Sequence, residues 1–259
     1  MKQVFLSFFS LSLCLFLFSC KKKDIKPLAP NYEDSVKRNL WGYYTFNNGS
    51  FEDKSGNGHN MRGVNGTQFG NDKANVANNA LSFDGINDYT VIDAGTNFPE
   101  SNFSVSLLMF AEKTSSGRIF VKGNFNDAKA VATTFGFDDD NKTNQLFFTI
   151  NKETDVCNTS PQNSSLTYLN TGVTIAQNTW YSIVVSHVNG TEYAYINGQL
   201  VASRITPTPM IKSCINAPFY FGIWWLQDLR PYMGKLDDVR IYTRGLSDAE
   251  IKFLSDNSR

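Results

Sequence analysis

The sequence predicts an all-β domain, a sandwich or jelly roll of short antiparallel strands that ends in one short helix. Its composition is rich in Phe, Tyr, Gly and Asn and poor in long apolar patterns of helical period, which suits half-buried strands joined by turns. Two Asn-Gly pairs, at Asn189 and Asn197, each separate two β-rich runs. Similar short runs recur along the chain with turn residues between them, a spacing typical of two packed sheets.

The first residues are expected to be an export signal and not a part of the fold. Lys2 is followed by an apolar run from Val4 to Phe18, which is short for a permanent transmembrane helix. The run ends in Leu17-Phe18-Ser19-Cys20, which resembles the lipobox of bacterial lipoproteins. The resemblance implies a signal peptide over residues 1–19 and a lipidated Cys20 as the mature N-terminus. An uncleaved anchor or a plain secretory signal is the alternative.

Residues 20–38 are expected to form a tether between the lipid and the domain. Three lysines follow Cys20 directly and two prolines come soon after, without a periodic apolar pattern. Because no aspartate follows Cys20, we expect the lipid anchor to lie in the outer membrane of the cell envelope. The formal net charge of the chain is zero, with no basic cluster beyond the tether, which argues against nucleic acid as a partner.

Two cysteines remain after the signal, Cys157 and Cys214. Export would place them in an oxidising compartment, where an even pair usually forms a disulfide. The chain-entropy model gives such a long loop about 4 kcal/mol of stabilisation. The alternative is two buried free thiols. Neither cysteine has the spacing of a redox or zinc site.

Residues 39–259 are expected to fold as one domain, a size that is normal for an all-β sandwich. The clearest passage is a three-stranded meander from Trp180 to Ala202. Asn-Gly is favoured in type I′ hairpin turns, because both central residues need positive φ. The other expected strands are Leu40–Phe46, Ala80–Phe83, Tyr89–Ile92, Phe103–Phe110, Gly117–Val121, Thr133–Phe137, Gln145–Ile150, Pro218–Ile223 and Lys235–Tyr242.

The chain is expected to end in a helix of about two turns. Ser247 and Glu250 have the spacing of a capping box, in which the N-cap hydroxyl and the third-residue carboxylate each accept the other's backbone N–H. Leu246 and Ile251 occupy the positions of a hydrophobic staple. The sequence therefore predicts a structural helix that begins after Ser247.

Four passages of the domain carry a family resemblance through their order and spacing. They are Tyr44-Thr45-Phe46 with Asp53-Lys54-Ser55-Gly56-Asn57-Gly58-His59-Asn60; Leu81-Ser82-Phe83-Asp84-Gly85-Ile86-Asn87-Asp88-Tyr89; Trp180-Tyr181-Ser182-Ile183-Val184-Val185 with Tyr195-Ile196-Asn197-Gly198-Gln199-Leu200-Val201; and Gly234-Lys235-Leu236-Asp237-Asp238-Val239-Arg240-Ile241-Tyr242 with the helix. Together they resemble the laminin-G-like branch of the concanavalin A-like lectin/glucanase superfamily, from Leu40 onward. The resemblance implies a two-sheet antiparallel jelly-roll sandwich.

The resemblance also implies a structural calcium ion, where the early loop meets the last strand. Matched residue by residue, Asp53 and Asp237 would give carboxylate oxygens, and Asn57 and His59 backbone carbonyls. Calcium prefers six to eight oxygens, and a Gly-rich loop can turn several carbonyls inward. Period two along the last strand is expected to place Asp237 and Asp238 on opposite faces. The alternative is an Asx-turn at Asp53, with Asp237 accepting backbone N–H groups and no metal.

The glucanases of this superfamily carry acidic residues at nearby positions of one strand, because retaining glycosidases need two carboxyls about 5 Å apart. Asp138 and Asp140 have alternate spacing but lie in a run typical of a solvated hairpin loop. Glu192 stands alone on its strand. His59 and His187 have no evident partner in the sequence. We expect a non-catalytic protein, while a triad assembled in space stays open.

One connection, residues 224–233, is rich in side chains that suit sugars. Sugar rings stack on flat aromatic surfaces, while a few polar groups supply directional hydrogen bonds. The candidate ligand-binding residues are Trp225, Arg230 and Tyr232. The alternative is the commoner role of large aromatics, with Trp224 packed into the core and Trp225 covering a sheet edge.

Three functions therefore stand in order of preference. The first is a monomeric carbohydrate-binding lipoprotein of the cell envelope. The second is an adhesion or assembly module that binds a surface protein, because exposed aromatics mark either kind of surface. The third is a hydrolase or lyase relative. Fold alone does not decide among them.

Overall fold

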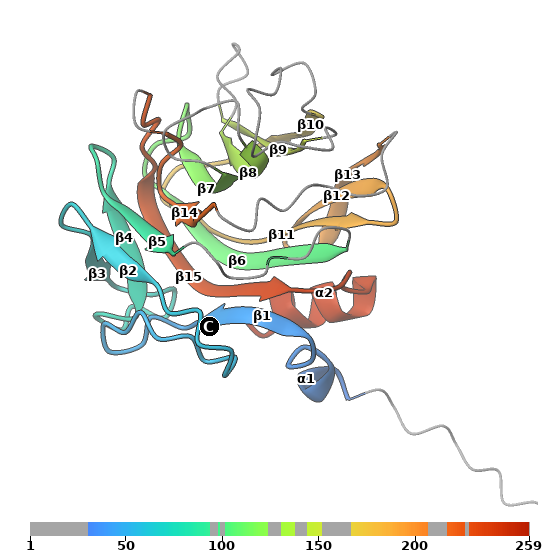
Figure 1. Ribbon diagram of the computed structural model, residues 1–259, viewed down its shortest axis with the longest axis horizontal. Coiled ribbons are helices and arrows are strands. Elements are labelled where there is room, and N and C mark those ends of the chain that lie inside the picture. Colours follow the sequence, from blue (N-terminus) through green and yellow to red (C-terminus); the bar gives the residue numbers. More distant parts are fainter. Residues whose placement is uncertain are drawn as a thin grey trace, which may run out of the picture. The chain divides into compact units, whose positions relative to one another are not determined.

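Two antiparallel sheets pack face to face and form a jelly-roll sandwich in the computed structural model (Figure 1). The structure describes residues 31–93, 98, 102–123, 131–137, 144–151, 167–206, 217–225 and 228–258. Sheet A has the order β13-β12-β11-β6-β15-β4-β3, and β1 also pairs with β15. Its strands are β1 (Leu40–Tyr44), β3 (Gln68–Gly70), β4 (Ala80–Asp84), β6 (Phe103–Ala111), β11 (Trp180–Val188), β12 (Thr191–Ile196), β13 (Gln199–Ile205) and β15 (Met233–Tyr242).

Sheet B has the order β10-β9-β8-β7-β14-β5-β2. Its strands are β2 (Arg62–Val64), β5 (Tyr89–Ile92), β7 (Arg118–Gly123), β8 (Val131–Phe137), β9 (Gln145–Ile150), β10 (Leu169–Thr174) and β14 (Phe219–Phe221). Each sheet combines strands that are consecutive in the sequence, such as β11-β12-β13 and β7-β8-β9-β10, with pairs that are distant in the sequence, such as β6-β15 and β7-β14. The expected two-sheet antiparallel jelly roll is confirmed.

The core between the sheets is largely aromatic. Phe103 from sheet A and Phe120, Phe148, Phe219 and Phe221 from sheet B are all fully buried. The ring of Phe219 lies 5.5 Å from that of Phe120 and 5.0 Å from that of Phe221, measured between centroids. Burying each such side chain contributes about 1.5–3 kcal/mol, which makes this layer the main source of stability.

The meander agrees with its prediction. β11, β12 and β13 pair in sequence, and the turns between them have positive φ at both central residues: 48° and 76° at Asn189 and Gly190, 51° and 75° at Asn197 and Gly198. The turn at Asn189 also fixes the register, in which His187 stands directly opposite Glu192. This register brings two ionisable side chains together.

Most of the other expected strands agree with the structure within two residues at each end. The sequence analysis missed β2, β3 and β10. β2 and β3 are three residues long and largely exposed, so they show no alternation of polar and apolar residues. β10 contains Asn170 and Gly172, which are typical of turns, and Gly172 has a φ of 66°.

Helix α2 (Asp248–Asp256) begins as predicted. The Ser247 hydroxyl accepts the Glu250 N–H, and the Glu250 carboxylate accepts the Ser247 N–H at 2.9 Å, which completes the capping box. Leu246 and Ile251 belong to one apolar cluster with Val184 of β11, as the staple requires.

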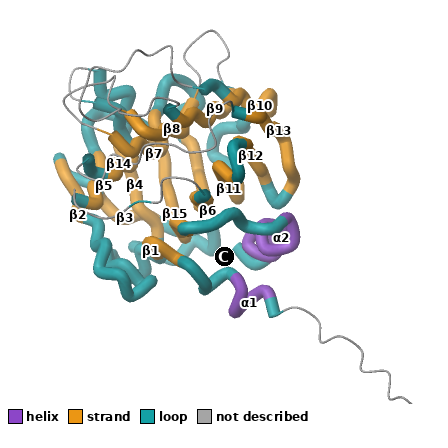
Figure 2. The backbone as a smooth tube through the Cα atoms, turned by 45° about the vertical axis from the view of Figure 1, so that its right-hand side comes forward, coloured by secondary structure: helices purple, strands orange, loops and turns teal. Residues whose placement is uncertain are grey.

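The folded unit begins at Asn31, before the Asn39 at which the sequence analysis starts the domain. Helix α1 (Tyr32–Ser35) lies beside α2 (Figure 2), with the Tyr32 ring 6.3 Å from that of Phe253. The Tyr242 hydroxyl donates to the carbonyl of the buried Val36 at 2.9 Å. The end of the expected tether is therefore packed against the sandwich.

Several expectations fall on residues outside those described: Cys20, Cys157 and Cys214, as well as Asp138 and Asp140. Among the helices that the structure describes, none is long and apolar enough to span a membrane.

Candidate functional site

The loop after β1 is a turn built around one carboxylate. Asp53 accepts hydrogen bonds from the backbone N–H groups of Tyr43 (2.9 Å), Ser55 (2.8 Å) and His59 (3.0 Å), and from the Ser55 hydroxyl (2.8 Å). Burial alone would raise the pKa of Asp53, but these hydrogen bonds lower it below its ordinary value. Both carboxylate oxygens of Asp53 thus already accept hydrogen bonds from the protein itself.

The other expected ligands in this loop also face their own backbone. The side-chain amide of Asn57 donates to the Leu40 carbonyl at 2.7 Å, and the His59 ring lies 4.1 Å from the Trp41 ring. The His59 carbonyl accepts the Tyr44 hydroxyl at 2.5 Å. Calcium at the Asp53 carboxylate or the His59 carbonyl would have to replace hydrogen bonds that these groups already accept, so these two groups suit the ion poorly.

Asp237 lies in different surroundings, in a pocket of about 490 Å³ on sheet A. Tyr43, Thr45, Asn47, Asp72, Ala74, Val76, Asn79, Asp237, Asp238, Arg240 and Asn257 line it. Asp237 is 7% exposed, and burial raises its pKa to about 8, with the charges of Asp238 and Asp72 adding to the shift. Its Oδ1 accepts the N–H of Asp238 at 2.6 Å.

The expectation that Asp237 and Asp238 point to opposite faces is wrong. The register of β15 against β6 shifts between Asp237 and Arg240, and Asp238 has a φ of 50°, so strict alternation is lost there. Both aspartates line the pocket. Sequence spacing cannot reveal a bulge inside a strand.

The pocket's oxygen donors suit a hard cation better than the Asp53 loop does. Asp72 and Asp237 offer carboxylates, Asn47 an amide and Thr45 a hydroxyl. Among the described residues no three His, Cys, Asp or Glu side chains are placed to hold a metal. Amide, hydroxyl or carbonyl oxygens would therefore have to complete a calcium site.

The Trp224–Trp225 turn projects from the end of β14. Gly222 allows this exit, because its φ is 96° and a Cβ there would lie 2.5 Å from the Phe83 ring. The Trp224 N–H donates to the Leu229 carbonyl at 2.7 Å, and Trp225 pairs with Asp228 in an isolated bridge. The two indole rings meet edge to face, 6.3 Å apart.

Two arginines flank this turn. The guanidinium groups of Arg230 and Arg118 lie 4.8 Å and 5.1 Å from the centre of the Trp224 ring. Arg230 Nε donates to Asp228 at 2.8 Å. Burial, with the charge of Arg118, lowers the pKa of Arg230. Arg118 was missed by the sequence analysis, although a charged residue next to the apolar run Ile119-Phe120-Val121 of β7 is a signal that could have marked it.

The indole nitrogens of Trp224 and Trp225 are both buried, and no acceptor in the described part of the chain reaches them. Both residues are nonetheless partly exposed. A buried donor without an acceptor is costly and calls for a specific explanation. The turn therefore holds two N–H groups without an acceptor among the described residues, and a ligand oxygen could reach them only after the partly exposed rings turn outward.

Tyr232 does not belong to this surface, which corrects its proposed role as a ligand-binding residue. It is 0% exposed, and its hydroxyl donates to the Phe110 carbonyl at 2.9 Å. Its ring meets that of Phe83 edge to face at 5.9 Å. Tyr232 directly precedes β15, and the alternation of buried and exposed side chains in that strand extends back to it, so it anchors the connection from inside the core.

A second polar cluster, which the sequence analysis did not predict, is buried at the end of the meander. The Glu192 carboxylate accepts the Thr167 hydroxyl at 2.6 Å, and burial raises its pKa to about 7. His187, opposite it in register, has Nε2 3.5 Å from the Thr206 hydroxyl. Both side chains are fully buried. The Asn-Gly turn was sufficient to predict this pairing, since it fixes the register.

The profile described as the concanavalin A-like lectin/glucanases superfamily matches residues 84–252. The chain belongs to this superfamily. A comparison with curated proteins finds no match.

Solved structures share the concanavalin A-like fold with this chain. Domain 4 of AbnA, an extracellular arabinanase from Geobacillus stearothermophilus solved in complex with arabinotriose, is 21% identical with a TM-score of 0.65, covering 83% of this chain and 98% of that one. The binding domain of botulinum neurotoxin DC, solved in complex with SialylT, is 14% identical with a TM-score of 0.63. The same domain, solved in complex with rat synaptotagmin II, is 16% identical to this chain with a TM-score of 0.62. Both alignments cover 86% of this chain and 52% of the neurotoxin chain.

Proposed function

We propose that this protein is a non-catalytic, lipid-anchored envelope protein that binds carbohydrate at the Trp224–Trp225 turn. The observation that carries the proposal is the pair of buried indole N–H groups without an acceptor in the described residues. Sugar hydroxyls are acceptors of the required kind. If the rings turn outward on binding, a sugar hydroxyl would accept these N–H groups and remove the desolvation cost that they carry in the free protein.

The surroundings of the turn supply the other interactions that a sugar needs. Trp224 has guanidinium groups near its ring, so Trp225 is the ring left to stack on the C–H face of a sugar. Arg230 and Asp228, held together at 2.8 Å, present donors and acceptors side by side. An aromatic surface with a few fixed polar groups is the usual composition of a small-ligand site.

The related structures support a binding role. The arabinanase domain was solved with arabinotriose, and the neurotoxin domain with SialylT and with a protein, synaptotagmin. For this chain we favour a glycan as the ligand. N–H donors without an acceptor, beside an aromatic ring, match the hydroxyl groups and C–H face of a sugar better than they match a flat protein surface.

The position of the protein in the cell is part of the proposal. Cys20 would carry the lipid, after removal of residues 1–19, and the absence of an aspartate after it favours the outer membrane. Export would also allow the Cys157–Cys214 disulfide. A membrane-bound binding domain would hold polysaccharide close to neighbouring enzymes or transporters.

Calcium would be a structural partner of this domain. Of the four ligands that the resemblance implies, the proposal keeps Asp237 and adds Asp72, because both line one pocket and the charge of Asp72 contributes to raising the pKa of Asp237. A divalent cation there would neutralise that repulsion. Asp53, Asn57 and His59 would instead hold the turn that borders β1.

A glycan array with the full chain in detergent tests the proposal. The wild type should bind a limited set of glycans, and Trp225→Ala should lose binding to at least one of them while its thermal unfolding midpoint stays within a few degrees. Failure of the folded wild type to bind any glycan would contradict the proposal and point to a protein partner. Repeating the array with chelator shows whether calcium takes part.

A further inference from the structure

A second pocket, on the other sheet from the Trp224–Trp225 turn, lies between the two helices. Its volume is about 360 Å³, and it is lined by Glu33, Val36, Lys37, Leu40, Tyr43, Asp238, Arg240, Phe253, Leu254 and Asn257. The segment that contains α1 forms one wall, α2 the other, and β1 and β15 the floor. We propose that this interhelical pocket binds a short neutral saccharide.

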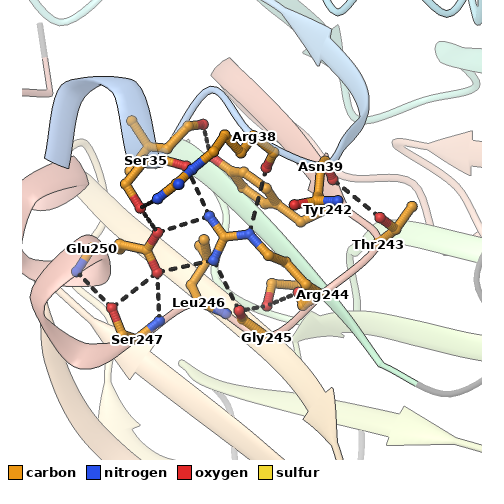
Figure 3. A network of polar contacts seen from close by, with 12 residues as sticks. Ser35, Arg38, Asn39, Tyr242, Thr243, Arg244, Gly245, Leu246, Ser247 and Glu250 are labelled. Carbon is orange, nitrogen blue, oxygen red and sulfur yellow. Dashed lines mark hydrogen bonds and ion pairs between the residues drawn. The ribbon is translucent and has the colours of Figure 1, made fainter. Parts of the chain in front are cut away.

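The wall that contains α1 is fixed by a polar network (Figure 3). Arg244 donates to the Ser35 carbonyl at 2.9 Å and to both carboxylate oxygens of Glu250, at 2.7 and 2.9 Å. The Ser35 hydroxyl also donates to Glu250. Because the network joins α1 to the start of α2, the pocket exists before any ligand arrives, which lowers the entropy cost of binding.

The floor is equally preorganised. The guanidinium of Arg240 lies 4.4 Å from the centre of the Tyr43 ring and donates to the Tyr43 hydroxyl at 2.9 Å. Arg240 also pairs with the Asp238 carboxylate. Asp238 and Arg240 are two residues apart in β15, so both side chains lie on the same face of the strand and pair within the pocket. Held polar groups of this kind orient a ligand at little entropic cost.

The charges of the pocket indicate a neutral ligand. Its two cations are each paired with one of its two anions: Arg240 with Asp238, and Lys37 with Glu33 at 3.0 Å. An ionic ligand would have to compete with these partners. The other pocket on sheet A differs, because three aspartates and one arginine line it and give it a negative excess.

The other residues that line the pocket favour a sugar over other neutral ligands. Val36, Leu40, Phe253 and Leu254 give an apolar wall, while the Asn257 amide and the Arg240–Asp238 pair give hydrogen-bonding groups. A saccharide ring has an apolar C–H face and a rim of hydroxyls, and so matches both. The volume is near the lower end of the 300–1,000 Å³ range of small-ligand sites, which suits a short ligand.

The inference does not depend on the Trp224–Trp225 turn, because the two sites share no residue. Tyr43, Asp238, Arg240 and Asn257 also line the pocket around Asp237, so the two pockets on sheet A meet at these residues. A saccharide seated between the helices could therefore extend toward Asp237.

Isothermal titration calorimetry with the full chain in detergent tests the inference. The probes are three neutral trisaccharides (arabinotriose, maltotriose and cellotriose) and the anionic sialyllactose. The experiment uses the Trp225→Ala background, so that binding at the Trp224–Trp225 turn does not contribute. We expect one molecule of at least one neutral trisaccharide to bind per chain, and more tightly than sialyllactose.

Two variants in this background place the binding. Lys37→Trp would fill the pocket from an exposed position, and Tyr43→Ala would remove its floor; each should weaken binding at least tenfold. Lys252→Trp is the matched control, because Lys252 is as exposed as Lys37, also pairs with an acid one turn away, and is not among the pocket residues. It should change the affinity less than twofold.

The two proposals fail in different ways. Wild-type binding that disappears entirely in Trp225→Ala would overturn the interhelical site and support the turn. Binding that survives Trp225→Ala and is lost in Lys37→Trp would support the interhelical site. Equal effects of Lys37→Trp and Lys252→Trp, or preference for sialyllactose, would overturn the inference.

Discussion

Glu250 and Arg244 meet through two hydrogen bonds, at 2.7 and 2.9 Å, and this pair joins the N-terminal segment to the last helix. The Glu250 carboxylate is also the third-residue acceptor of the capping box. One side chain thus starts helix α2 and holds α1 in place. The burial of Glu250 leaves little water to replace either function.

Glu250→Gln should therefore lower the free energy of unfolding by about 2–3 kcal/mol, since it leaves a charged arginine without its partner. Urea unfolding at neutral pH measures this. Glu33→Gln, which removes an exposed partner of Lys37, is the control and should cost less than about 1 kcal/mol. Equal losses in the two variants would contradict the network's role.

The same pair predicts how acid affects stability. Burial opposes the charge of Glu250, but hydrogen bonds from Arg244, Ser35 and Ser247 prevail and lower its pKa from 4.5 to about 2. A lowered carboxyl pKa stabilises the fold fully above pH 4.5, and this stabilisation is lost as pH falls toward 2. Wild-type stability should thus fall between these values more steeply than that of Glu250→Gln.

Glu192 should affect the pH dependence of stability in the opposite direction to Glu250. Burial raises its pKa from 4.5 to about 7, so its neutral form is favoured in the fold. The stabilisation is present below pH 4.5 and is lost as pH rises through 7, by up to about 3 kcal/mol. Glu192→Gln can still accept from Thr167 and should be more stable than wild type at pH 8 but not at pH 4. Denaturant titrations at both values measure the difference; a gain of the same size at both would contradict it.

Asp53 and Asp237 are expected to respond differently to calcium. Asp53→Asn weakens four hydrogen bonds to one anion and should cost about 2–3 kcal/mol with or without calcium. Asp237→Asn should instead abolish the rise in thermal midpoint that calcium gives the wild type, because a ligand that binds only the folded state stabilises it. Differential scanning calorimetry with calcium and with chelator separates the two. A calcium effect lost in Asp53→Asn and kept in Asp237→Asn would reverse the assignment.

The fold was readable from the sequence because its signals are local. Asn-Gly turns fix the meander, Ser247 and Glu250 start the helix, and alternating apolar residues mark long strands such as β6. Of the strands that were missed, β2 and β3 have no fully buried residue and so no alternation, and β10 is masked by Asn170 and Gly172, which are typical of turns.

The site was less readable, because its geometry depends on irregular backbone. The adjacent residues Asp237 and Asp238 line one pocket because of a bulge and a left-handed φ at Asp238, and neither feature leaves a mark in the spacing of residues. From the sequence, Tyr232 was expected at the surface, as part of a connection rich in aromatic residues. In the structure it lies directly before β15, and its side chain is buried in the core. Arg118 reaches Trp224 only after two distant strands have paired.

The most direct test of the proposed function is the role of the unfilled indole donors. Using a glycan identified on the array, isothermal titration calorimetry compares the wild type with Trp225→Ala, Trp225→Phe and the control Trp180→Phe, which alters another partly exposed tryptophan. Trp225→Ala should lose at least tenfold in affinity, and Trp225→Phe, which keeps a ring and removes the N–H, about three- to tenfold, as expected for one hydrogen bond of about 1 kcal/mol. Trp180→Phe should bind like the wild type. Wild-type affinity in both Trp225 variants would contradict carbohydrate binding at this turn.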